Sequence, residues 1–406
     1  MRNRSILAII YVSVAFASGC SYFDKKQTEN TQPLEAREAE NEVEEDKNSG
    51  PTKLNKKFSS SVKIQVAWRK KFGSGLEEHY LKLRPSFQDG VLFISDRNGE
   101  LITVDAASGK LKWKIEEKNV EYTSSAGVGD GLVLVGTGDG RVIAREAKSG
   151  NLKWIVRTSS EVLAPPTSSD GITVIRSADG SLVGIDSKTG LEIWNYRREA
   201  PRLTLRGNSR PLADDGILFS ALDNGRLLAL DLRLGRSIWD KAITVPSGVT
   251  DLERMVDLDG DPVLTKDFIY VSSYQGGVTA LSKVDGQIVW ARQISSHNGL
   301  TRGNGRIYAV DEDSSLWALD ENDGISVWKQ EELKRRSLTD PVFFKNYIVV
   351  GDFEGYIHWI NADTGEIVFR TRLDKKGITA PPIVADDMVV VRSVSGKTIA
   401  LKPNKS

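Results

Sequence analysis

The stretch "IDSKTGLEIW", residues 185–194, is one of seven copies of a pattern that decides the fold. Each copy has a glycine four residues before an aromatic residue, and five copies have an acid four residues before that glycine. The copies end at Trp113, Trp154, Trp194, Trp239, Trp290, Trp328 and Phe369. With Trp68 added, neighbouring aromatic positions lie 38 to 51 residues apart. Such self-similarity at a nearly fixed period indicates a repeat architecture.

Each period also contains two apolar strings that are bounded by turn residues. "DGVLFISD" (89–96) and "GELITVD" (99–105) are the first such pair, and eight pairs follow one another along the chain. Strands that are separated by Asp-Gly or Asn-Gly turns form hairpins. A weaker strand precedes each pair, and a fourth strand carries the aromatic residue. The sequence therefore predicts an all-β fold, an eight-bladed β-propeller of four-stranded antiparallel blades.

The two ends of the repeat region are complementary. The last copy stops at "GKTIALKPNKS" (396–406) and lacks its fourth strand, whereas "VKIQVAW" (62–68) is an extra aromatic strand at the other end. We expect the N-terminal strand to complete the last blade and close the ring, because an open ring would leave unpaired edges.

The residues of the repeated pattern have structural roles. The acid can accept hydrogen bonds from turn amides. The glycine can take a positive φ angle, and the tryptophan can bury its ring against the next blade while its N–H finds a partner. We interpret the pattern as a clasp between blades, not as a site of chemistry.

The first residues resemble a bacterial lipoprotein signal. An apolar run over residues 6–16 is too short for a membrane-spanning helix, and it is followed by "FASGC", which ends at Cys20, the single cysteine. This resemblance predicts a signal peptide over 1–19 and lipidation of Cys20. Ser21, where an Asp would favour the inner membrane, implies the periplasmic face of the outer membrane.

The next segment is polar and acidic. Residues 20–60 have almost no apolar side chains after Leu34, so they cannot bury enough surface to offset the entropy of ordering. We expect a lipidated, disordered tether over 20–60 and the propeller over 61–406.

Composition argues against several classes of function. The 55 basic and 55 acidic residues cancel, which gives no global electrostatic case for nucleic acid. The three histidines are widely spaced, and neither a nucleophile elbow nor a phosphate loop is present. "DLDGD" (257–261) spaces its acids like a calcium loop, but Pro262 stands where such a loop needs glycine. We expect no catalytic residue, no metal and no cofactor.

The repeated pattern resembles the tryptophan-docking motif of the pyrroloquinoline-quinone (PQQ) dehydrogenase repeat family. Those enzymes are longer and carry a cysteine pair, which this chain lacks. "RLTLRGNSRP" (202–211) and "YIHWINADTGE" (356–366) are similar to the BamB family, lipoproteins of the β-barrel assembly machinery (BAM) of Gram-negative outer membranes. This resemblance implies a non-enzymatic scaffold that binds the POTRA domains of BamA and other BAM subunits and assists outer-membrane protein folding and insertion.

The same resemblance implies which residues bind the partner: Leu203, Leu205, Arg206, Asp257 and Asp259. Two leucines that are two residues apart can point the same way from an extended loop, and the arginine can bind a carboxylate through two hydrogen bonds. Alternatively, the leucines are core residues of an inner strand and the acids cap a solvated turn. Whether Asp261 contributes, whether the partner adds a strand or contacts loops, and whether unfolded outer-membrane proteins bind directly stay open.

Two other functions are compatible with the sequence. One is a quinoprotein or a binder of a small ligand in the central channel, and the other is a scaffold of another envelope complex. A channel that binds a ligand would be lined by convergent polar groups.

Overall fold

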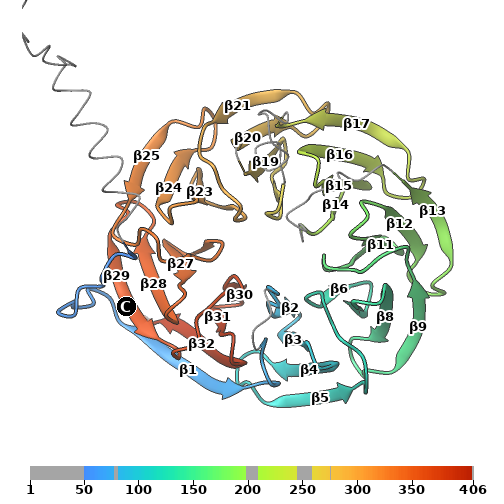
Figure 1. Cartoon of the computed structure of the whole chain (residues 1–406), viewed down its shortest axis with the longest axis horizontal. Coiled ribbons are helices and arrows are strands. Elements are labelled where there is room, and N and C mark those ends of the chain that lie inside the picture. Colours follow the sequence, from blue (N-terminus) through green and yellow to red (C-terminus); the bar gives the residue numbers. More distant parts are fainter. Residues whose placement is uncertain (1–49, 77–80, 198–208, 245–257, 275, 405–406) are drawn as a thin grey trace, which may run out of the picture. The chain divides into compact units, whose positions relative to one another are not determined.

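The computed structural model describes residues 50–76, 81–197, 209–244, 258–274 and 276–404. The chain divides into two compact units, 1–50 and 51–406. The second unit contains eight four-stranded sheets that follow one another around a ring (Figure 1). This arrangement confirms the predicted eight-bladed propeller.

Every blade has the same order, with the first strand innermost and the fourth at the rim (Figure 1). Blade 1 contains β2 (Ser86–Gln88), β3 (Val91–Asp96), β4 (Glu100–Asp105) and β5 (Leu111–Glu116). Blade 2 contains β6 (Gly127–Gly129), β7 (Leu132–Gly136), β8 (Arg141–Glu146) and β9 (Leu152–Arg157). Blade 3 contains β10 (Thr167–Ser169), β11 (Ile172–Arg176), β12 (Leu182–Asp186) and β13 (Glu192–Tyr196). Blade 4 contains β14 (Leu212–Asp214), β15 (Ile217–Ala221), β16 (Arg226–Asp231) and β17 (Ser237–Ala242).

The second half of the ring repeats this order. Blade 5 contains β18 (Val263–Leu264), β19 (Phe268–Ser273), β20 (Gly277–Ser282) and β21 (Ile288–Arg292). Blade 6 contains β22 (Thr301–Gly303), β23 (Arg306–Val310), β24 (Leu316–Asp320) and β25 (Ser326–Gln330). Blade 7 contains β26 (Val342–Phe344), β27 (Tyr347–Gly351), β28 (Tyr356–Asn361) and β29 (Ile367–Arg372). Blade 8 contains β30 (Ile383–Ala385), β31 (Met388–Arg392), β32 (Lys397–Pro403) and, as its rim strand, β1 (Ile64–Lys71).

Ring closure takes the predicted form. Strand β1 runs antiparallel to β32, from the pair Ile64–Pro403 to the pair Lys71–Lys397. The first strand of the propeller thus completes the blade that the end of the chain begins.

The repeated pattern forms the expected clasp. The indole N–H of each of the seven repeat tryptophans donates to a backbone carbonyl of the next blade, at 2.8–3.2 Å. Trp194, for example, reaches the Leu232 carbonyl and lies over Gly235, whose φ is +65°. A Cβ there would lie 2.5 Å from the indole, so both the conformation and the close approach require glycine.

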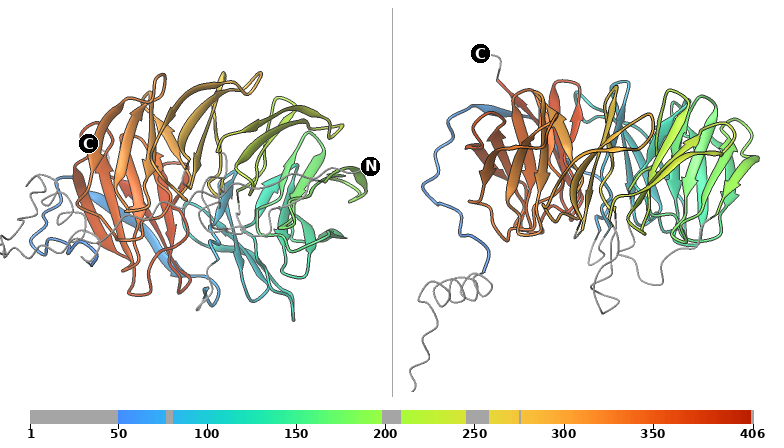
Figure 2. Two further views of the ribbon diagram at one scale, coloured as in Figure 1. Left: turned by 45° about the horizontal axis from the view of Figure 1, so that its top comes forward. Right: turned by 90° about the horizontal axis from the view of Figure 1, so that it is seen from above.

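The core lies between the blades and is built from their second and third strands. Every residue of β7 and of β11 is buried, and Figure 2 shows these sheets packed side by side when the ring is seen from its edge. In the described residues, no helix has the length and apolar character needed to span a membrane.

The strand order gives the ring two different faces. On one, which we call the connection face, the fourth strand of a blade leads to the first strand of the next. On the other, the clasp face, the turns between third and fourth strands carry the repeated pattern.

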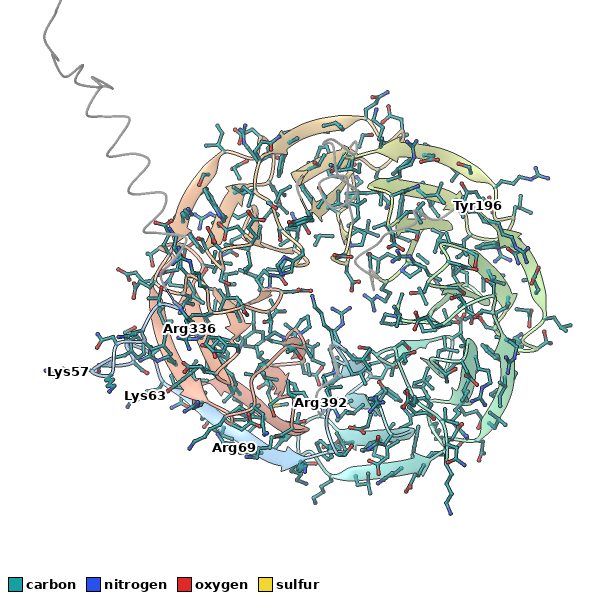
Figure 3. The ribbon with its side chains drawn as sticks, in the orientation of Figure 1. Lys57, Lys63, Arg69, Tyr196, Arg336 and Arg392 are labelled. Atoms are coloured by element: carbon teal, nitrogen blue, oxygen red, sulfur yellow. The ribbon has the colours of Figure 1, made fainter. Side chains whose placement is uncertain are left out.

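Residues 51–62 form an extended strap on blade 7, although we expected the propeller to begin at residue 61. The Thr52 amide donates to the Lys334 carbonyl at 3.1 Å, and the Ser61 amide donates to the Val368 carbonyl of β29 at 2.9 Å. Figure 3 places Lys57 of this strap outside the ring. The strap covers the rim edge of blade 7.

Candidate functional site

Most of the predicted site residues lie outside the described part of the chain. Cys20, Leu203, Leu205, Arg206 and Asp257 belong to this group, so their roles stay predictions. Asp259 is described, and it lies on the connection face just before β18. The described flanks of the two nominated segments, 209–210 and 258–261, are both on this face.

The flank 258–261 is firmly seated. Leu258 is fully buried in the core between blades 4 and 5. Gly260 packs against the backbone of Gly299, where a Cβ would lie 2.5 Å from the Gly299 Cα. Since these contacts hold the backbone on both sides of Asp259, this carboxylate has little freedom to move away from its surroundings.

Asp261 joins the two flanks to each other. Its Oδ1 accepts a hydrogen bond from the Arg210 amide at 2.7 Å, and its Oδ2 lies 3.9 Å from the Arg210 Nε. Oδ2 also accepts a hydrogen bond from the Arg84 guanidinium. Burial alone would raise the pKa of Asp261, but Arg84 and then Arg210 outweigh it and hold this pKa below its ordinary value. Asp261 is therefore ionised, and both of its oxygens bind partners within the protein.

Asp259 has a different environment. Its Oδ1 is shielded from water and has no hydrogen-bond partner among the described residues. Burial, the main cause, raises the pKa of Asp259 to about 6, while Lys82 and Arg176 counteract this and Asp223 and Asp340 add to it. An incoming cation could satisfy this carboxylate oxygen.

The flank 209–210 is held a second time from blade 3. The Arg176 guanidinium, almost fully buried, donates to the Ser209 carbonyl at 3.1 Å and pairs with Asp223. A similar buried pair, Arg392 with Asp96 at 2.7 Å, joins blades 8 and 1. Figure 3 labels Arg392 at this junction and Arg336, which lies in the connection between blades 6 and 7.

The central channel opens beside these groups. A cavity of about 350 Å³ is lined by Arg84, Arg210, Asp261 and Asp340, together with prolines and apolar residues that begin the inner strands. The Lys82 ammonium lies 3.8 Å from the Asp340 carboxylate at the same level. Among the described residues, no group of three or more His, Cys, Asp and Glu side chains is placed to hold a metal ion. The charges of the channel mouth pair with one another, which suits a structural role.

Sequence reasoning missed Arg84, Arg210 and Lys82. A signal was present, because charged residues directly precede a proline at the start of several inner strands: Arg84-Pro85, Arg210-Pro211, Asp261-Pro262 and Asp340-Pro341. The residue before a proline is held extended, so these side chains recur at one level of the ring.

Comparisons with known proteins agree with this architecture. The sequence model of the family described as "Outer membrane protein assembly factor BamB" matches residues 65–121, 116–330 and 326–405. The chain is 34% identical over 411 residues to a protein of that name from Yersinia pestis, covering 98% of this chain and 99% of that one. It is 39% identical over 341 residues to one from Alkalilimnicola ehrlichii, covering 84% and 89%. The crystal structure of BamB from Moraxella catarrhalis superposes with a TM-score of 0.74 at 25% identity, covering 82% of this chain and all of that one. The chain belongs to the BamB family of outer membrane protein assembly factors.

Proposed function

We propose that this protein is a non-enzymatic scaffold of the outer-membrane β-barrel assembly complex. It binds the POTRA domains of BamA through the connection face and assists the folding and insertion of outer-membrane proteins. A lipid on Cys20 anchors it to the periplasmic face of the outer membrane, and residues 20–50 connect the anchor to the propeller. The relatives are named as assembly factors, which supports a role in assembly and not in catalysis.

One observation carries the choice of site. The described flanks of the two nominated segments, 209–210 and 258–261, meet at a single carboxylate, Asp261. Segments that are 51 residues apart in sequence can thus act as one binding surface. The buried Oδ1 of Asp259 has no hydrogen-bond partner in the described part of the chain, and a cation of the partner that reached it would pair with it.

The test is the affinity of the full-length lipoprotein, in detergent, for the soluble POTRA domains of BamA. We expect Leu203→Ala, Leu205→Ala and Arg206→Ala together to weaken binding at least tenfold, since arginines are enriched among the residues that dominate interface energies and each leucine would lose buried apolar area. The control removes exposed side chains of the same kinds from blade 3, namely Leu191→Ala, Ile193→Ala and Lys188→Ala. It should bind like the wild type.

If the triple variant binds like the wild type, the nominated site is wrong and the scaffold role survives. If the wild type does not bind POTRA domains, the proposed function fails.

A second activity is favoured by a separate observation. The rim strands of blades 1 to 6 expose apolar side chains, for example Leu111, Leu152, Ile193, Ile238, Ile288 and Val327. Strand edges of this kind accept extended segments. We therefore propose that these rims also receive amphipathic strands of unfolded outer-membrane proteins.

A further inference from the structure

One ion pair in the channel mouth joins opposite sides of the ring. Arg84 precedes β2 of blade 1, and Asp261 precedes β18 of blade 5, four blades further on. Figure 1 shows blades 1 and 5 facing each other across the centre. Their ion pair therefore crosses the channel and does not join neighbours.

This pair is well placed to hold its geometry. The side chains of Arg84 and Asp261 are 23% and 22% exposed, so water screens them only partly. The backbone of Arg84 is fixed as well, because its amide donates to the Ser125 hydroxyl at 3.0 Å. The guanidinium thus extends from a rigid wall to a carboxylate on the opposite wall.

Asp261 transmits this restraint to the described flanks of both nominated segments, 209–210 and 258–261. It is two residues from Asp259 in the chain, and it accepts the amide of Arg210, the residue that ends the other segment. We propose that Arg84 is a positioning residue for the partner-binding surface, acting through Asp261 from the far side of the channel. This inference rests on the proposed function, and it adds a residue that neither nominated segment contains.

If Arg84 acts through Asp261, replacing it should lower the affinity for the POTRA domains although Arg84 does not touch them. Arg84→Met should weaken POTRA binding about tenfold, the size of effect known for residues that act through others. Arg84→Lys keeps the charge on a shorter, single-pronged side chain and should restore part of the affinity. The matched control is Arg145→Met, which breaks a part-buried ion pair with Glu117 between blades 1 and 2. It should leave affinity unchanged.

A double-mutant cycle distinguishes positioning from direct contact. In an Asp261→Ala background, which removes both acceptor oxygens, Arg84→Met should weaken binding no further, because the route through Asp261 is already broken. An additive loss would mean that Arg84 touches the partner itself, which overturns the positioning role. Unchanged affinity in Arg84→Met overturns it too.

Hydrogen exchange of the Arg210 amide gives a readout that needs no partner. This amide donates to Asp261, so Arg84→Met should speed its exchange at least tenfold, whereas Arg145→Met should not. If wild type fails to bind POTRA domains, the proposed function falls, but the Arg210 amide still decides whether Arg84 positions the flank. An unchanged exchange rate would refute the inference.

Discussion

In each blade, the aromatic residue of the rim strand faces a residue of the third strand, and the two are complementary in size. Trp154 faces Ala144, Trp194 faces Gly184, and Trp68 faces Ala400 across the closing pair. In blade 7 the sizes are exchanged, because Phe369 faces Trp359. The smaller phenylalanine of the seventh copy thus fits beside the larger Trp359.

Asp259 is a second residue whose surroundings matter, because burial raises the pKa of its carboxyl group. Its pKa is about 6 in the folded protein and near 3.8 in the unfolded chain, so folding favours the neutral acid. The associated stability is fully present below pH 3.8 and is lost as the pH rises through 6. Asp259→Asn should therefore raise the free energy of unfolding at pH 7.5, by up to about 3 kcal/mol, and the gain should vanish near pH 4. Denaturant unfolding at both pH values measures this difference.

Under the proposed function, the same carboxylate should make partner binding depend on pH. If a partner cation meets Oδ1, the pKa of Asp259 falls in the complex and binding releases a proton. Affinity for POTRA domains should then rise between pH 5 and pH 7 and level off above, whereas Asp259→Asn should flatten this profile. A wild-type profile as flat as that of the variant would remove Asp259 from the interface.

Among the elements, the rim strands carry a prediction of their own. The strap shows that a rim edge can hold a passing segment by a backbone hydrogen bond, because the Ser61 amide donates to the Val368 carbonyl of β29, although the sheet of blade 7 keeps four strands. A ten-residue peptide of alternating apolar and polar residues should bind the open rims weakly. Ile193→Lys together with Ile238→Lys should reduce that binding severalfold, since both side chains are about half exposed on adjacent rims. The same changes should leave POTRA binding intact, and peptide binding that survives them would exclude these rims.

The sequence was sufficient for the elements that repeat and insufficient for contacts that do not. The period, the turns and the unmatched strand at each end predicted eight blades and their closure, because each repeat reports the same local geometry. The Arg84–Asp261 pair spans 177 residues and appears once, so no period reveals it. The strap was missed for a similar reason. Its polar composition predicts a tether, and only the tertiary contacts of Thr52 and Ser61 order it.

For the whole molecule, the stability of the ring depends on its closure in blade 8, where the rim strand β1 does not follow the third strand β32 in the chain. Every rim strand but β1 follows its blade directly in the chain, whereas β1 is held to β32 by pairing and to blade 1 by the hydrogen bond from Trp68 to the Ala106 carbonyl, at 2.8 Å. The chain itself links each blade to the next, including β1 to β2 of blade 1, so the break lies inside blade 8, where only non-covalent contacts join β1 to β32. We expect unfolding to begin where β1 leaves β32.

Locking this junction should therefore slow unfolding more than locking any blade. Gln65 and Lys402 pair directly, so Gln65→Cys with Lys402→Cys, in a Cys20→Ser background, would join β1 to β32 by a disulfide. Closing this long loop stabilises by about 6 kcal/mol in the chain-entropy model, against about 3 kcal/mol for a loop near 15 residues. The control joins Arg141→Cys to Arg157→Cys within blade 2, where the residues also pair directly. Unfolding rates in denaturant, oxidised against reduced, should fall far more for the closure disulfide, because only it blocks the opening step. Equal slowing by both disulfides would show that the ring opens elsewhere.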